Sequence, residues 1–195
     1  MKLFISIIAF FSLVLMLAQC TGNKQSPLSP EAEKTYLENG KTIAAATFAE
    51  LSGKLTNALE KNGVSGAVEY CSLTAIPLLD SLSKVHNATI RRTSTKLRNP
   101  VDKPTEWESG ILAEFEKKAM SGEEMQPIVR KLDEHTVTFA APIKMLPLCS
   151  KCHGAVGSDI AEGDYATIKK LYPSDTAIGY KTGELRGIWS ITFNK

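Results

Sequence analysis

The C-terminal half of the chain carries a C-x-x-C-H motif, formed by Cys149, Cys152 and His153. Two thiols separated by two residues can each add to one vinyl group of a porphyrin and become thioethers. The imidazole that follows is then held against one porphyrin face, within reach of the iron. The motif therefore predicts one covalently bound haem c, attached through Cys149 and Cys152, with His153 as the proximal iron ligand.

Three other uses of paired cysteines compete with this interpretation. A thioredoxin-like redox pair is typical of an early strand-to-helix turn in a βαβ unit, whereas this pair comes late in the chain. A zinc site needs four ligands, and adjacent Cys152 and His153 do not easily converge on one tetrahedral ion. A plain disulfide suits an oxidising compartment but leaves His153 unexplained.

The cysteine count draws attention to a further residue. The chain has four cysteines, and Cys71 is left over once two are assigned to haem and Cys20 to a lipid, as argued below. Its ordinary interpretation is a small buried hydrophobic side chain. Its functional interpretation is a thiolate that ligates the iron opposite His153. Other candidates for that position are His86, His135, Met120, Met125 and Met145, of which Met145 lies close to the attachment segment.

Arginine side chains are candidates for holding the two haem propionates, because buried carboxylates need cationic or hydrogen-bonding partners. The candidates are Arg91, Arg92 and Arg98. On a strand, Arg91 and Arg92 point to opposite faces, so at most one turns toward the haem. We take Arg92 and Arg98 as cofactor-binding candidates, against the alternative of a solvated charged strand. Side chains that could line the porphyrin, although they are more often ordinary core, are Trp107, Phe139, Pro142 and Leu148.

The N-terminus predicts export. Residues 1–19 have the pattern of a signal peptide, with Lys2 ahead of an apolar run too short to be a comfortable membrane span. The end of this run resembles a bacterial lipobox in which Cys20 is lipidated, although Gln19 replaces the small residue usual there. Residues 20–30 are polar, contain two prolines and predict a tether. We expect an exported protein, periplasmic or in the cell envelope, with a lipid anchor to the membrane.

Composition and hydrophobic pattern predict a single haem c domain over residues 31–195. Without residues 1–19 the chain has 22 basic and 21 acidic residues, so no nucleic-acid partner is expected. An apolar stripe at four-residue steps predicts a helix over 31–62 that ends at Asn62-Gly63. The remaining predicted helices span 67–73, 77–86, 104–121 and 165–171, and the predicted strands span 88–94, 128–132, 136–145 and 185–193. This order favours an α+β fold with an antiparallel sheet.

Four segments together resemble a family of bacterial mono-haem c domains, long described as a domain of unknown function. The segments are Tyr70-Cys71 with Ala75-Ile76-Pro77; Arg91 to Ser94 with Lys96, Arg98-Asn99-Pro100 and Pro104; Ala141-Pro142-Ile143 with residues 149–154; and Tyr172 to Asp175 with Gly179-Tyr180, Gly183-Glu184 and Arg186-Gly187. The resemblance implies a PAS-like antiparallel sheet flanked by helices, with Cys71 and His153 as the axial pair. The chain departs from the family pattern at Asp102, where asparagine is usual.

Three classes of function follow from a haem c domain. The first is a redox or small-ligand sensor that lacks its own output domain and acts on a separate, unidentified partner protein. The second is a periplasmic single-haem electron carrier. The third, a peroxidase-type enzyme, requires an open distal site and an acid/base group. Ligation by Cys71 would close that site, so we expect a sensor or carrier and no enzyme.

Overall fold

The computed structural model describes residues 26–193, so the predicted signal peptide and Cys20 lie outside the described residues. Its centre is a four-stranded antiparallel sheet in the order β1-β4-β3-β2. The strands are β1 (Ala88–Thr93), β2 (Ile128–Lys131), β3 (Val137–Lys144) and β4 (Leu185–Phe193). Each agrees with a predicted strand to within one or two residues at its ends.

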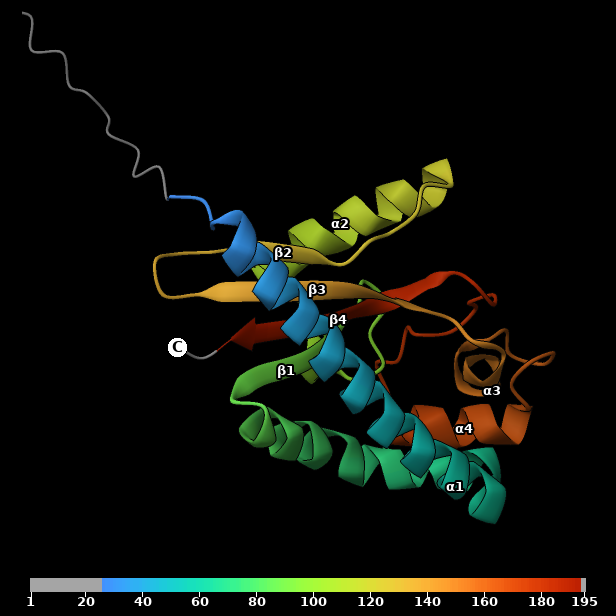
Figure 1. Cartoon of the computed structure of the whole chain (residues 1–195). Helices are drawn as coiled ribbons and strands as arrows, with labels where there is room; N and C mark the ends of the chain where they lie inside the picture. Colours follow the sequence, from blue (N-terminus) through green and yellow to red (C-terminus); the bar gives the residue numbers. More distant parts are fainter. Residues whose placement is uncertain (1–25, 194–195) are drawn as a thin grey trace, which may run out of the picture.

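Helix α1 (Pro30–Val85) consists of two limbs that meet at Gly63. Ser29 caps its start by accepting a hydrogen bond from the Ala32 N–H. Gly63 has φ 65° and ψ −169°, a backbone conformation that breaks the helix and is almost restricted to glycine. The first limb crosses the sheet and the second returns beneath it, alongside α4 (Glu162–Leu171) (Figure 1). The predicted stop at Asn62-Gly63 is therefore the bend between the limbs.

The second limb corrects two of the predicted helices. The separate helices expected over 67–73 and 77–86 form one limb that runs through Pro77 to Val85. Proline removes a backbone donor and normally breaks a helix interior. Here Leu79 is buried, and Leu82 packs against the same core cluster. This apolar contact offsets the missing hydrogen bond and carries the helix past Pro77.

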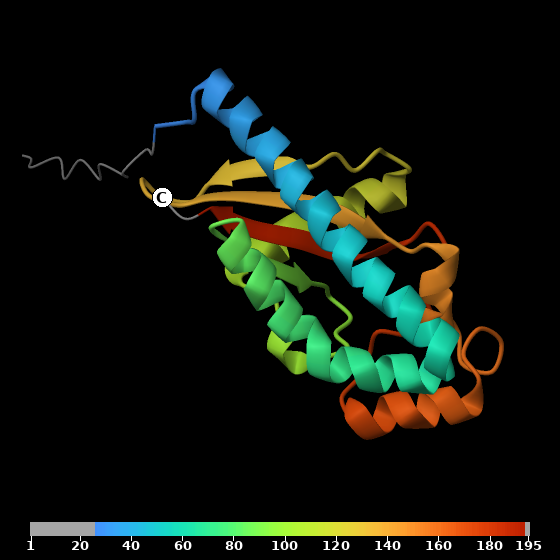
Figure 2. The same ribbon diagram turned by 60° about the horizontal axis from the view of Figure 1, so that its bottom comes forward.

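Two hydrophobic clusters cover the two faces of the sheet. The first limb of α1 packs on one face, where the Phe139 ring lies so close to Gly40 that a Cβ there would sit 2.3 Å from it. Helix α2 (Glu106–Ser121) packs on the other face through Ile111, Leu112 and Phe115. Figure 2 shows α1 in front of the sheet and α2 behind it. Alternation along the strands therefore decides which helix each side chain meets.

The predicted tether enters the fold at its end. Leu28 packs against the α1-side core, and the Lys131 ammonium donates to the Ser26 carbonyl oxygen at 3.1 Å. The chain is thus anchored to β2 before α1 begins. Among residues 26–193, no helix has the length and apolarity needed to cross a membrane.

The connection between β3 and β4 carries the cysteine motif. This connection contains the short 3-10 helix η2 (Pro147–Cys149), helix α3 (Ser150–His153) and α4. Another 3-10 helix, η1 (Pro100–Asp102), follows β1. The β3–β4 register shifts between Ile143 and Lys144, where the strands begin to part toward this connection. The antiparallel sheet flanked by helices confirms the predicted α+β, PAS-like class.

Candidate cofactor site

The C-x-x-C-H motif forms a compact turn at one end of the sheet. Ser150 stabilises the turn by donating its hydroxyl to the Pro147 carbonyl oxygen at 2.7 Å. Cys149 packs against a small cluster that contains Met145 and Tyr180, whereas Cys152 packs against a different cluster between α1 and α4. Both cysteines are free thiols and partly buried.

The hydrogen bonds of His153 fix its tautomer. Its Nδ1 lies 2.7 Å from the Ala177 carbonyl oxygen. A carbonyl oxygen can only accept, so Nδ1 carries the hydrogen and Nε2 keeps its lone pair. Burial lowers the pKa of His153 well below its ordinary value, and the charges of Arg186 and Arg98 lower it further. The imidazole is therefore neutral, with Nε2 in the form that binds a metal ion.

Arg98 joins this arrangement from the loop after β1. One of its terminal nitrogens donates to the carbonyl oxygens of Cys152 and, at 3.3 Å, Ala177. The same nitrogen is 3.0 Å from His153 Nδ1, but both groups bear hydrogens, so this contact is not a second bond to the ring. On its other side Arg98 Nε lies 3.1 Å from a carboxylate oxygen of Asp175. Arg98 thus ties the motif backbone to the segment that faces it.

Cys71 lies at the same site although it comes from the second limb of α1. Burial raises the pKa of the Cys152 thiol to about 11, and the charge of Cys71 is one of the influences that raise it further. Burial also raises the pKa of Cys71, and the Arg92 charge opposes this shift. The charge of Cys71 acts on the pKa of Cys152, and charge interactions fade with distance. Cys152 also packs on the cluster that contains Val68, about one helical turn before Cys71 on α1, so the fold places Cys71 near Cys152.

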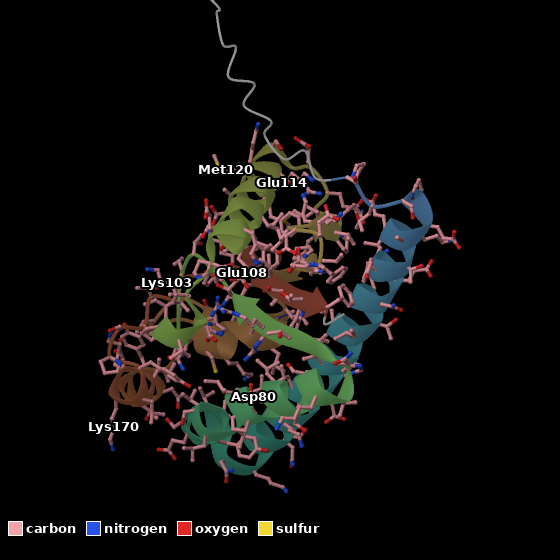
Figure 3. The ribbon with its side chains drawn as sticks, turned by 90° about the vertical axis from the view of Figure 1, so that its left-hand side faces the viewer. Asp80, Lys103, Glu108, Glu114, Met120 and Lys170 are labelled. Carbon is pink, nitrogen blue, oxygen red and sulfur yellow. The ribbon has the colours of Figure 1, made fainter. Side chains whose placement is uncertain are left out.

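The competing ligand candidates lie elsewhere. His86 caps the end of α1, and His135 lies in the exposed β2–β3 turn, at the opposite end of the sheet from α3 (Figure 1). Met120 is 90% exposed and lies at the end of α2, far from Lys170 on α4 (Figure 3).

The last two methionines are buried in separate clusters. Met125 packs with α2 on the far face of the sheet, and Met145 packs beside Cys149 in the attachment segment. Of the candidates named from the sequence, Cys71 is the one that the fold places with Cys152 and Arg92.

Arg91 and Arg92 point to opposite faces of β1, as predicted. Arg91 donates to the Lys103 carbonyl oxygen at 2.9 Å and pairs with Glu108 on the α2 side. Arg92 lies opposite Trp189 in the β1–β4 register, with its guanidinium 5.9 Å from the ring centroid. Arg92 is therefore the strand arginine that faces Cys71.

A third arginine at the site was not among the candidates. Burial lowers the pKa of Arg186, and the charges of Arg98 and Arg92 lower it further, so the three guanidinium groups are close together. The buried Nε atoms of Arg92 and Arg186 have no hydrogen-bond partner within residues 26–193. Its position in the Arg186-Gly187 segment of the family pattern was the available signal. Buried guanidinium nitrogens without a hydrogen-bond partner indicate a place for an anionic group.

Two side chains considered as porphyrin contacts instead belong to the core. Phe139 is fully buried against Gly40 on the α1 side. Trp107 packs with α2 on the opposite face. The positions of these two side chains depend on which helix covers which face of the sheet, and the local sequence does not determine that arrangement.

The fold bears directly on one of the competing interpretations of the cysteine pair, the thioredoxin-like one. The sheet is antiparallel throughout, so the pair is not at the turn of a βαβ unit. Cys71, Cys149 and Cys152 are all free thiols. The described part of the chain contains no group of three or more His, Cys, Asp or Glu side chains that could hold a metal ion by themselves.

Comparison with known proteins places the chain in a family. A family model described as Tll0287-like matches residues 18–194. Among solved structures, the cyanobacterial haem protein Tll0287 has a similar fold, with a TM-score of 0.60 and 20% sequence identity over 86% of this chain and 98% of that chain. No curated protein matches the chain in sequence. The resemblance found in the four sequence segments is confirmed, and the chain belongs to the Tll0287-like family.

Proposed function

We propose that this protein binds one haem c covalently through Cys149 and Cys152, with His153 and Cys71 as axial ligands. The observation that carries the proposal is His153 itself, whose Nδ1 hydrogen bond leaves Nε2 free within a C-x-x-C-H turn that Cys71 approaches. A fixed imidazole and a nearby thiol are the donor set of a six-coordinate haem iron. The similar fold of the cyanobacterial haem protein supports the haem-binding part of this proposal.

The arginines suit the two propionates of such a group. Arg92 and Arg186 have buried Nε atoms without hydrogen-bond partners, while nearby carboxylates are few, Asp102 and Asp175 being those that influence these guanidinium groups. Arg98 uses one terminal nitrogen and Nε on the His153 side, and its other terminal nitrogen remains for a carboxylate. We infer that Arg92, Arg98 and Arg186 together bind the propionates.

We infer that the protein acts as a redox or small-ligand sensor. The bound haem would supply a one-electron couple and an iron whose preference for a thiolate depends on its oxidation state. Cys71 lies on α1, whereas the other attachment residues lie between β3 and β4. Release of Cys71 would therefore free the second limb of α1 from the rest of the site, which gives the molecule two states.

A groove lies near this thiol, although Cys71 itself does not line it. This open groove of about 330 Å³ is lined by Ser72, the neighbour of Cys71, and by Tyr172, whose pKa is affected by the Cys71 charge. The signal would pass to a separate protein partner at the periplasmic side of the membrane, to which the lipid on Cys20 would hold the domain.

A second candidate is an electron carrier. Two protein ligands would saturate the iron, and this arrangement favours outer-sphere electron transfer over chemistry on a bound substrate. The same saturation is the reason to propose that the protein is not an enzyme.

The test is to produce the protein with a cytochrome c maturation system and record electrophoresis and spectra. The haem should stay attached through denaturing electrophoresis, and Cys149→Ala or Cys152→Ala should weaken or abolish that signal. Carbon monoxide added to the reduced protein should bind the iron if Cys71 leaves, as a sensor requires, and should not bind in an electron carrier. A colourless protein with stoichiometric zinc would contradict the proposal.

A further inference from the structure

Asp175 is a buried carboxylate that the proposed function does not yet use. It lies in the turn after α4, where its N–H donates to the Tyr172 carbonyl oxygen at 2.9 Å. Its side chain is 0% exposed. One oxygen, Oδ1, accepts the Ala177 N–H at 2.9 Å, and Oδ2 has no hydrogen-bond partner within the described chain. Burying a carboxylate is costly unless its charge is compensated.

That charge is compensated by Arg98, and both residues lead to the same imidazole. Asp175 Oδ1 lies 3.1 Å from Arg98 Nε and also accepts the Ala177 N–H, which restrains the residue whose carbonyl oxygen faces His153. The Ala177 carbonyl oxygen accepts from His153 Nδ1 at 2.7 Å and from Arg98 at 3.3 Å. The carboxylate therefore holds both groups that determine where the His153 hydrogen bond is made.

Residues 175–180 are also held by hydrogen bonds to other parts of the chain. Thr176 donates its N–H and hydroxyl to the Leu97 carbonyl oxygen, at 2.8 and 3.1 Å. Tyr180 donates its N–H to the His153 carbonyl oxygen at 2.9 Å. The Ala177 carbonyl thus lies between two fixed points. Asp175 is the charged side chain of residues 175–180, and the Lys96 ammonium also holds them by donating to the Ile178 carbonyl oxygen at 2.7 Å.

We propose that Asp175 is the positioning residue of the proximal ligand, and that through Ala177 and Arg98 it fixes the tautomer and orientation of His153. This inference rests on the proposed function for its effect on the haem, but it also makes a claim about the haem-free chain. A hydrogen bond at the second ring nitrogen commonly sets the orientation and donor strength of a ligating histidine. Asp175 would act on His153 without touching it.

The first test uses the haem-free chain labelled with ¹⁵N-histidine. The chain has three histidines, so substitution of His86 and His135 assigns the His153 signals. At a fixed pH where His153 is neutral, the wild type should show the tautomer with hydrogen on Nδ1. Asp175→Ala should convert this to a mixture of both tautomers, whereas Asp175→Asn, which can still accept the Ala177 N–H, should keep it.

The matched control is Asp159→Asn and Asp159→Ala. Asp159 is an exposed carboxylate in the loop after the motif and accepts the Ala155 N–H at 2.9 Å, a local contact like that of Asp175 but without a connection to His153. Both control variants should leave the tautomer unchanged. An Asp175→Ala chain that keeps a single Nδ1 tautomer with wild-type shifts would overturn the inference.

The second test uses the haem-loaded protein. Asp175→Asn removes a buried negative charge and leaves the Arg98 charge uncompensated near the iron. The ferrous state should therefore be stabilised relative to the ferric state. We expect at least a tenfold shift of the ferric–ferrous equilibrium, about 59 mV upward for one electron, with unchanged electron paramagnetic resonance g values. Asp175→Ala should shift the potential and also broaden the g values, because the ring loses its fixed orientation.

The outcomes separate the two proposals. If Asp175→Ala does not fold, Asp175→Val takes its place in the ¹⁵N experiment, and a single Nδ1 tautomer with wild-type shifts in that variant overturns the inference. If the wild-type protein acquires no covalent haem, the proposed function fails, and the ¹⁵N experiment on the haem-free chain still decides the role of Asp175.

Discussion

At the scale of single residues, Cys71 combines two environments. It is partly buried on the second limb of α1, and the neighbouring Arg92 lowers the pKa that burial raises. A cation of this kind favours the thiolate, which is the form that binds iron. The thiolate would place negative charge on the metal and stabilise its ferric state relative to a methionine ligand.

Replacement of this thiol should change the spin state of the iron. We expect Cys71→Ala to convert a low-spin ferric haem to a high-spin or water-ligated haem, with the covalent attachment unchanged. Visible spectra and electron paramagnetic resonance measure this. Ser72→Ala is the control, since the Ser72 hydroxyl donates only to the Glu69 carbonyl oxygen within the helix. A persistent low-spin signal in Cys71→Ala would assign the sixth position to another residue, with His86, His135 and Met125 next to be tested.

Arg92 should stabilise the two forms of the protein differently. Its buried Nε has no hydrogen-bond partner among the described residues, so in the haem-free chain the charge is a cost, whereas a propionate would compensate it. We expect Arg92→Gln to raise the free energy of unfolding of the haem-free protein and to lower that of the haem-loaded protein, each by about 1–3 kcal/mol. The melting temperatures of the two forms should shift in the same directions.

Arg91→Gln provides the comparison for Arg92. Arg91 already has protein partners, the Lys103 carbonyl oxygen and Glu108. Its loss should therefore destabilise both forms in the same direction. Equal effects of Arg92→Gln on the haem-free and haem-loaded proteins would show that Arg92 does not bind the cofactor.

At the scale of elements, the bend in α1 places Cys71. The first limb runs away from the N-terminus across the sheet, and the second must reverse to pass α4. Ser65 fixes the start of the second limb, because its N–H and hydroxyl both donate to Asp164 of α4, at 3.0 and 2.7 Å. The segment just after the bend is therefore fixed to α4, and Cys152 packs between α1 and α4.

Alanine at the bend should be costly. Gly63 has φ 65° and ψ −169°, which side-chain-bearing residues rarely adopt, so Gly63→Ala should lower the free energy of unfolding by about 1–3 kcal/mol. The control is Gly53→Ala, at an exposed helical position where a Cβ meets nothing within 4 Å. That change should raise stability by about 0.5–1 kcal/mol. Chemical denaturation measures both, and a neutral Gly63→Ala would mean that the bend does not depend on glycine.

At the scale of the whole molecule, the site joins distant parts of the chain. Cys71 comes from α1, Arg92 and Arg98 come from β1 and the loop after it, and His153 comes from the β3–β4 connection. Since α1 begins directly after the predicted tether, release of Cys71 would act on the helix nearest the predicted membrane anchor. This connectivity suits a sensor whose partner lies at the membrane.

The anchor itself is a prediction about residues outside the described part of the structure. Mass spectrometry of the mature protein should find an N-terminus at Cys20 that carries acyl groups, and Cys20→Ser should release the protein from membranes. An unmodified N-terminus further along the chain, in a freely soluble protein, would remove the anchor while leaving export intact.

The spacing of residues along the chain was sufficient to predict the motif, most of the secondary structure and the directions of the strand arginines. The C-x-x-C-H motif is recognised from five consecutive residues, because its chemistry depends on two thiols and an imidazole at that spacing. Strand positions followed from periodicity, and the end of the first limb of α1 followed from Asn62-Gly63, since glycine tolerates the required backbone. That the chain continues there as a bend between two limbs did not follow from the sequence. Alternation along β1 showed that Arg91 and Arg92 diverge.

Only the tertiary structure decided which groups meet. The β1–β4 register sets Arg92 beside Trp189 on the Cys71 side, and the return of α1 brings Cys71 to Cys152. No sequence pattern connects Asp175 with His153, because Ala177, the residue that links them, is held by contacts between separate loops. Packing also carried the helix through Pro77 and placed Phe139 in the core. Periodicity determines the elements of a chain, whereas long-range contacts determine the surroundings of each side chain.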